Sequence, residues 1–153
     1  MDFQTLPEIC EYMANFVTGE NPSILEPTPG EGNLVRSLEK KGTVTAPQNI
    51  FSLPETRYDW VVANPPFTPM KVGYQILDKC LEISDNLVFL LPWLVIINSE
   101  RRTRKLQDFG LVSVTHLPRK AFNGARVQTC ILELKKGYTR GTRLHFYRLG
   151  QKN

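Results

Sequence analysis

The chain has 153 residues, of which 41% are hydrophobic and 22% charged, so it fits one globular domain with a substantial core and excludes a two-domain enzyme of ordinary size. Its eleven Pro and ten Gly are scattered without a period, which excludes collagen-like and disordered chains. The net charge of +4 hides an asymmetry: residues 1–75 carry 5 basic and 9 acidic side chains, and residues 76–153 carry 14 and 6. The second half is therefore the better candidate to contact a polyanion.

The first half of the chain alternates helix and strand signals. Thr5-Leu6-Pro7-Glu8 is typical of a helix start, because Pro and acidic residues are favoured in a first turn. Apolar residues then recur at helical spacing, which predicts a helix from Pro7 to about Val17. The further predicted elements are a short strand 23–25 that ends at Glu26, a turn 27–32, a helix 33–40, a strand 43–45 and a buried strand 58–63.

The second half predicts more strands in succession. Its elements are a helix 72–83, a strand 86–91, a short basic helix 99–108, and strands 111–117, 129–134 and 144–147. This order favours an α/β fold with a mainly parallel sheet, helices on both faces and an antiparallel C-terminal hairpin. No repeat or linker divides the chain, so we expect a single domain over residues 1–153.

The cysteines and the apolar runs bear on the environment of the protein. Cys10, Cys80 and Cys130 lie far apart and form no CxxC or Cys/His cluster, so we expect reduced thiols in a cytoplasmic, reducing compartment and no metal site. No secretory signal is visible. The longest apolar stretch, Leu87–Ile97, is too short to span a bilayer, and we interpret it as a buried strand.

Two motifs follow predicted strand ends. Glu26-Pro-Thr-Pro-Gly-Glu-Gly32 lies between a strand and a helix, where an open parallel sheet has its ligand crevice. Its glycines allow a ligand to approach the backbone, although steric relief in the turn explains them equally. In Asn64-Pro65-Pro66-Phe67 the two prolines stiffen the turn and remove its amide donors, leaving the Asn amide and the Pro65 carbonyl as fixed acceptors.

Those acceptors suit one kind of chemistry. The exocyclic amine of a nucleobase is a poor nucleophile, because its lone pair is delocalised into the ring. Acceptance of both its N–H groups by Asn64 Oδ1 and the Pro65 carbonyl favours the pyramidal, nucleophilic nitrogen, while Phe67 stacks on the base. The alternative is a plain Pro-rich turn with Phe67 in the core.

The two motifs together resemble a known family. ILEPTPGEG followed by YDWVVANPPF is similar to the class I S-adenosylmethionine-dependent methyltransferases, and the NPPF form resembles the N6-adenine DNA methyltransferases of the gamma order. Residues 5–13, 90–92, 121–122 and 129–136 resemble further segments of that family, so the likeness covers nearly the whole chain. It implies a Rossmann-like sheet and S-adenosylmethionine as the cofactor.

The resemblance also implies roles for individual residues. Glu26 would receive the amino group of the cofactor, with Thr5, Pro27, Gly30, Gly32 and Asn64 around it, and Asn49-Ile50 would lie at its adenine. The catalytic motif would be Asn64, Pro65, Pro66 and Phe67. Phe67 and Phe122 would contact the target base, although a core role for Phe122 is equally consistent with the sequence.

The sequence departs from the family pattern in two places. No acidic residue follows the strand 43–45, where the family holds the ribose of the cofactor, and Gln48 or Glu55 is left to take part of that role. The short connection from Gly32 to Asn64 indicates that one β-α unit is missing. We expect no target-recognition domain within residues 1–153, so sequence reading would fall to a short loop or to a separate specificity protein.

Basic residues in the predicted helix 99–108 are candidates for phosphate contacts, namely Arg101, Arg102, Arg104 and Lys105, although a solvated helix face explains them equally. His116 and His145 have no paired ligands, and Trp60 and Trp93 fit core packing.

Three hypotheses for the function follow. The first is methyl transfer from S-adenosylmethionine to adenine N6 in DNA. The second is the same chemistry on rRNA adenine or a protein glutamine. The third is a methyltransferase-like protein that binds nucleic acid or a partner and has lost cofactor affinity.

Overall fold

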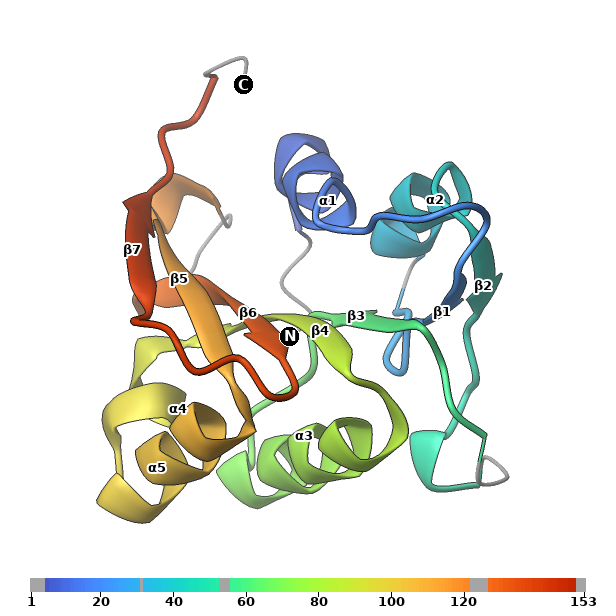
Figure 1. The fold of residues 1–153 in the computed structure, drawn as a ribbon. Coiled ribbons are helices and arrows are strands. Elements are labelled where there is room, and N and C mark those ends of the chain that lie inside the picture. The colour runs from blue at the N-terminus through green and yellow to red at the C-terminus, as the bar shows by residue number, and fades with distance from the viewer. Residues whose placement is uncertain (1–4, 31, 53–55, 122–126, 151–153) are drawn as a thin grey trace.

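Seven strands form one sheet, in the order β2-β1-β3-β4-β6-β5-β7 (Figure 1). The structure is a computed structural model that describes residues 5–30, 32–52, 56–121 and 127–150. The strands are β1 Ser23–Leu25, β2 Thr43–Thr45, β3 Trp60–Ala63, β4 Asn86–Pro92, β5 Leu111–Leu117, β6 Thr129–Lys135 and β7 Arg143–Phe146. The helices are α1 Pro7–Ala14, α2 Asn33–Glu39, α3 Met70–Ile83, α4 Trp93–Ile97 and α5 Glu100–Phe109, with the 3₁₀ turns η1 Ile50–Ser52 and η2 Arg119–Ala121.

The strand directions confirm a mainly parallel sheet. The pairs β2–β1, β1–β3, β3–β4 and β5–β7 are parallel, whereas β6 runs antiparallel to both β4 and β5. The predicted antiparallel C-terminal hairpin is formed by β5 and β6. The last strand, β7, instead returns to the outer side of β5 in parallel.

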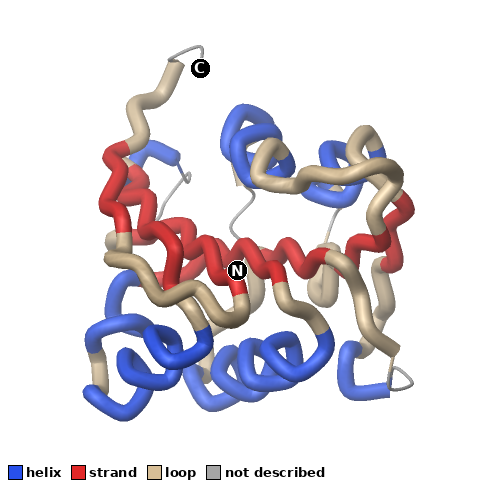
Figure 2. The backbone as a smooth tube through the Cα atoms, viewed as in Figure 1, coloured by secondary structure: helices blue, strands red, loops and turns tan. Residues whose placement is uncertain are grey.

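Helices cover both faces of the sheet, as predicted. Helices α1 and α2 lie on one face, and α3, α4 and α5 lie on the other (Figure 2). Alternate residues of each central strand pack against the two helical layers. In β3, Val61 and Ala63 pack on the α3 side, and Val62 packs on the α1 side. This period of two is expected for a sheet buried on both faces.

The connection from β2 to β3 is short, as the sequence indicated. Within its described residues it contains one regular element, η1, and β2 is the outermost strand. Ile50 of η1 is buried in the hydrophobic layer between the sheet and α3.

The interpretation of Leu87–Ile97 as one buried strand was wrong. β4 ends at Pro92, and Trp93 begins the short helix α4. Both segments are apolar, so an apolar run alone does not distinguish a strand from a short helix. Helix α1 also ends earlier than predicted, at Ala14, because Phe16 and Val17 follow in tighter turns that hydrogen-bond to Met13 and Ala14.

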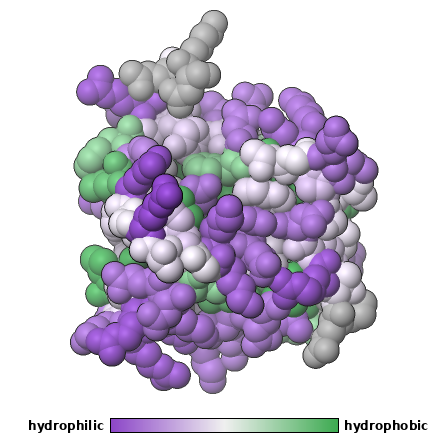
Figure 3. Space-filling view, in the orientation of Figure 1, coloured by the Kyte–Doolittle hydropathy of each residue, from purple (hydrophilic) through white to green (hydrophobic). Residues whose placement is uncertain are grey.

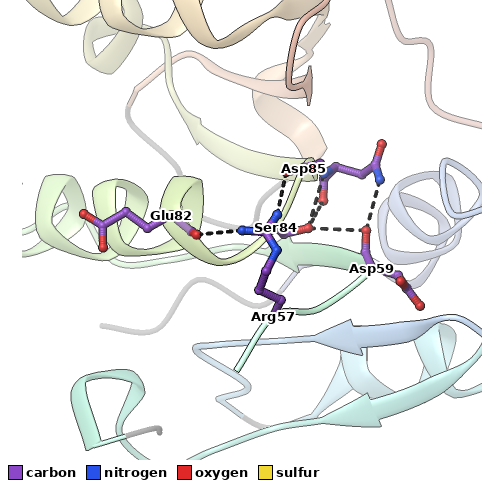
Figure 4. A network of polar contacts seen from close by, with 6 residues as sticks. Arg57, Asp59, Glu82, Ser84 and Asp85 are labelled. Atoms are coloured by element: carbon purple, nitrogen blue, oxygen red, sulfur yellow. Dashed lines mark hydrogen bonds and ion pairs between the residues drawn. The ribbon is translucent and has the colours of Figure 1, made fainter. Parts of the chain in front are cut away.

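The amino ends of the strands carry a polar network (Figure 4). Arg57 donates to the carbonyl of Glu82, in the last turn of α3, at 3.1 Å and pairs with the Asp85 carboxylate at 2.6 Å. The Asp59 carbonyl accepts from Ser84 Oγ at 3.3 Å. These contacts fix the edge of the sheet opposite to the one that carries the predicted site.

The segment that follows β7 reaches the first helix. Tyr147 Oη donates to Glu8 Oε2 at 2.7 Å, and the Gly150 N–H donates to the same oxygen at 3.0 Å. Both bonds, with that from Gly150 the stronger effect, lower the pKa of Glu8. Helix α1 is thus tied to the other end of the described chain. None of the described helices is long and apolar enough to cross a membrane.

Candidate functional site

The predicted site lies at the carboxyl ends of neighbouring strands, as an open parallel sheet requires. Glu26 follows β1 and Asn64 follows β3, and β1 and β3 pair directly. The Glu26 N–H donates to the Thr45 carbonyl at 2.9 Å, which extends the ladder between β1 and β2 by one residue and fixes the start of the glycine turn.

The Glu26 carboxylate is withdrawn from solvent. The residue is 2% exposed, and its Oε1 accepts the Thr28 N–H at 2.7 Å. Burial raises the pKa of Glu26 to about 7, against the lowering effect of Thr28. A buried acid that lacks a cationic partner among the described residues is a natural acceptor for a cationic ligand group such as an ammonium.

The turn after Glu26 leaves room for a ligand. Gly30 and Gly32 have φ of +52° and +84°, values that side chains rarely adopt, and a Cβ at Gly30 would meet nothing within 4 Å. The Thr28 hydroxyl lies near enough to Glu26 to help lower its pKa, yet its buried Oγ1 meets hydrogen-bond geometry with no described group. A buried hydroxyl without a partner, next to an open turn, fits a polar ligand.

Asn64 is oriented by a residue that precedes α1. Asn64 Nδ2 donates to the hydroxyl of Thr5 at 2.7 Å, and Thr5 is itself 8% exposed. Because the amide nitrogen is engaged, Oδ1 is left as an acceptor at the end of β3. Thr5, predicted as a cofactor contact, thus positions the proposed catalytic amide in this structure.

Phe67 lies in the core. Its ring is 9% exposed, packs over Gly73 and meets the Tyr74 ring edge-on at a centroid distance of 6.0 Å. A Cβ on Gly73 would stand 2.1 Å from the Phe67 ring, so the glycine makes this burial possible. Stacking of Phe67 on a base would require the ring to leave this position.

The other residues predicted at the site are divided between the core and the surface. Pro27 and Pro65 are buried, and Pro66 is exposed. Asn49 is exposed and its Oδ1 accepts the Phe51 N–H, whereas Ile50 is 3% exposed and packs in the core. Phe122 lies outside the described residues.

No acidic residue stands at the carboxyl end of β2 in the described part of the chain. Asp59 lies at the opposite edge, where its Oδ2 accepts the Ser23 N–H, and Glu39 closes α2. Gln48 is exposed just beyond β2, and Glu55 lies outside the described residues.

The basic run on α5 is mostly engaged with acids. Arg102 and Lys105 pair with Asp78 of α3 at 3.0 and 2.8 Å, and Arg104 pairs with Glu100 at 2.6 Å. The Arg102 guanidinium also lies 4.0 Å from the Tyr74 ring centroid. These contacts tie α5 to α3, and within the described chain Arg101 is the member of the run without an ion pair.

The sequence analysis did not identify the roles of three residues: Thr28, Gly73 and His116. Thr28 and Gly73 carry no signal beyond a Pro-flanked hydroxyl and a glycine inside a helix, which commonly marks close packing. His116, expected to serve packing, accepts a hydrogen bond at Nδ1 from Trp93 Nε1 at 2.9 Å. Among the described residues no group of three or more His, Cys, Asp or Glu is arranged to hold a metal ion.

The comparisons with known proteins identify a fold through solved structures, and they find no match among family models or curated proteins. Solved structures do match. A modification subunit assigned to a type I restriction enzyme of Vibrio vulnificus YJ016 superposes with a TM-score of 0.77 at 14% identity, covering 99% of this chain and 48% of that one.

Two further matches are methyltransferases of different kinds. The methyltransferase subunit of a type I restriction-modification system from Streptococcus thermophilus gives a TM-score of 0.71 at 15% identity, over 90% of this chain and 45% of that one. The 23S rRNA methyltransferase ErmE gives 0.66 at 16% identity, over 88% and 70%. The chain therefore has the class I S-adenosylmethionine-dependent methyltransferase fold, and it spans about half the length of the modification subunits.

Proposed function

From this methyltransferase fold we propose that the chain transfers a methyl group from S-adenosylmethionine to N6 of adenine in DNA. The observation that carries the proposal is the Asn64 amide at the end of β3. Thr5 occupies its nitrogen at 2.7 Å, which leaves Oδ1 as an acceptor, one strand away from the buried Glu26 and the open glycine turn.

The residues at the turn fit the proposed cofactor. Glu26 would accept its ammonium group, the Thr28 hydroxyl has no other partner among the described groups, and the Gly30 backbone leaves open space. When bound, S-adenosylmethionine supplies an electrophilic methyl carbon. The protein positions the target amine: Asn64 Oδ1 and the Pro65 carbonyl accept its two N–H groups and favour its pyramidal, nucleophilic form.

DNA is favoured as the substrate by the NPPF motif and by the modification subunits among the structural matches. The match to a 23S rRNA methyltransferase supports rRNA adenine as the second candidate. A protein glutamine is the remaining amide substrate. We further propose that a separate specificity protein reads the DNA sequence.

A different class of function is supported by the end of β2. An acid there would accept the ribose hydroxyls of the cofactor, and the described chain has none. If cofactor affinity is lost on that account, the protein is a methyltransferase-like binding protein. Calorimetric titration with S-adenosylmethionine separates this class from the enzymes.

The catalytic proposal is tested by transfer of tritiated methyl groups to adenine-containing DNA, rRNA and protein, with methyl-adenine identified in the digested product. We expect transfer to DNA, and its loss in Asn64→Ala with cofactor affinity nearly unchanged, because Asn64 contacts the base in the transition state. Undiminished turnover in Asn64→Ala would remove Asn64 from the mechanism. Wild-type activity on protein alone would remove adenine as the target.

A further inference from the structure

Exposed apolar side chains gather on one side of the molecule. Six large apolar residues are exposed in the described chain, and Phe51 of η1 is the one outside this group. Figure 3 shows apolar surface over β7 and, below it, over α4. We call this region the β7 surface, and its exposed members are Leu94, Ile97, Val127, Leu144 and Phe146, at 49 to 70% exposure.

Hydrogen bonds and ring contacts connect the elements that carry the β7 surface. The backbone N–H of Trp93 donates to the Gln128 carbonyl at 3.0 Å, which places α4 beside the segment that holds Val127. Trp93 Nε1 donates to His116 of β5, whose ring lies 5.8 Å from that of Phe146. The apolar groups on α4 and β7 thus flank a continuous row of aromatic rings.

The edge strand β7 has two unlike faces. Leu144 and Phe146 pair in register with Val114 and His116 of β5, so they lie on the face of the sheet that packs against α3, α4 and α5. Arg143 and His145 alternate with them and lie on the face toward α1. The strand ends the sheet order, so its outer edge has no strand partner in the described structure.

The surroundings of β7 are cationic. Arg140, Arg143 and Arg148 are exposed, and none of them forms an ion pair with a described residue. A partner strand beside β7 would therefore find Leu144 and Phe146 on one face and, on the other, the positive charge of Arg143, which has no ion pair with a described residue.

We propose that the β7 surface docks an extended segment of a partner protein, which adds a strand beside β7 and alternates apolar with acidic side chains. Its backbone would complete the open edge, its apolar residues would cover Leu144 and Phe146, and its acids would face Arg143. The surface alone supports this inference, which therefore stands whether or not the chain transfers methyl groups.

Two other occupants fit less well. A second copy of β7, paired so that the apolar faces join, brings a second Arg143 to the face that already holds Arg143 and supplies no acid, and like charges near one another destabilise a strand pair. Nucleic acid would meet the arginines but leave the aliphatic Leu94, Ile97 and Leu144 in water, since bases stack on aromatic rings.

The experiment uses the full chain and a fluorescent ten-residue peptide that alternates Val with Glu, followed by fluorescence anisotropy. We expect binding that weakens at least tenfold when Lys replaces Glu in the peptide, and at least tenfold in Leu144→Ser/Phe146→Ser. Phe51→Ser, which removes an equally exposed apolar group elsewhere, should bind as the wild type does. Circular dichroism on each variant checks that the fold is retained.

A single charge-reversal variant, Arg143→Glu, tests the proposal independently of the double variant, which could fail to fold. Arg143→Glu should weaken binding of the Glu peptide and strengthen binding of the Lys peptide. The proposal is overturned if neither peptide binds, if both bind equally, or if the variants leave binding unchanged. It is also overturned if Leu144→Ser/Phe146→Ser abolishes self-association in sedimentation or binding of an oligo-dT strand, because the occupant is then a second copy or a nucleic acid.

Discussion

Replacement of Glu26 by Gln tests the buried acid at the end of β1. The carboxyl is 2% exposed, and its pKa is about 7 against an ordinary value of 4.5. A raised pKa means that the folded protein holds a proton that the unfolded chain releases at lower pH. The contribution of protonated Glu26 to the stability of the fold is therefore full below pH 4.5, and it is lost as the pH rises to about 7.

The size of the effect follows from the pKa difference. It corresponds to about 3 kcal/mol of the free energy of unfolding, and the full value applies because solvent does not screen the group. Gln keeps the shape of the protonated acid and can still accept the Thr28 N–H. Glu26→Gln should therefore be about as stable as the wild type at pH 4.5 and about 3 kcal/mol more stable at pH 8.

Urea unfolding of both proteins at intervals from pH 4.5 to pH 8 measures this difference. The matched control is Glu39→Gln, which removes an exposed carboxylate at the end of α2 and should follow the wild type. A stability difference between Glu26→Gln and the wild type that does not change with pH would show that burial leaves the Glu26 carboxyl unperturbed.

Three further predictions concern the site and its support. Thr5→Val removes the hydroxyl that holds Asn64 and should lower kcat about tenfold in steady-state methyl transfer, with Thr5→Ser restoring it; an unchanged kcat would end the positioning role of Thr5. Gly73→Ala overpacks the Phe67 ring and should lower the free energy of unfolding by about 1–3 kcal/mol in urea, whereas Gly141→Ala, where a Cβ meets nothing within 4 Å, should not. Calorimetry should give an affinity for S-adenosylmethionine about 10-fold to 100-fold below that of a site with an acid after β2, and a sub-micromolar dissociation constant contradicts this.

Local sequence patterns predicted most of the fold. β1, β2 and β5 have the predicted bounds, because β-branched and apolar residues fill them and Gly or Pro stands close by. The placement of Glu26 and Asn64 at one edge followed from topology, since the carboxyl ends of parallel strands meet there.

Contacts between residues far apart in the chain could not be predicted from local sequence patterns. Asp78 stands 24 positions from Arg102 and 27 from Lys105, so nothing local indicated that these cations serve the α3–α5 contact. The burial of Phe67 depends on Gly73, which lies close by in the sequence within α3, but the sequence alone does not show that the ring packs on this glycine. The pattern around Phe67 was compatible with both a stacking and a core role, and in this structure the ring lies in the core.

The bonds from Tyr147 and Gly150 to Glu8 bear on when the site is completed during folding. They join residues 139 and 142 positions apart, and contacts across such long loops carry a large closure entropy and form late. Helix α1, whose N-terminal flank supplies Thr5 to Asn64, therefore gains these anchors only after β7 has been synthesised. We expect a chain that ends before Tyr147 to lack both anchors of α1 and therefore to hold Thr5 less firmly against Asn64.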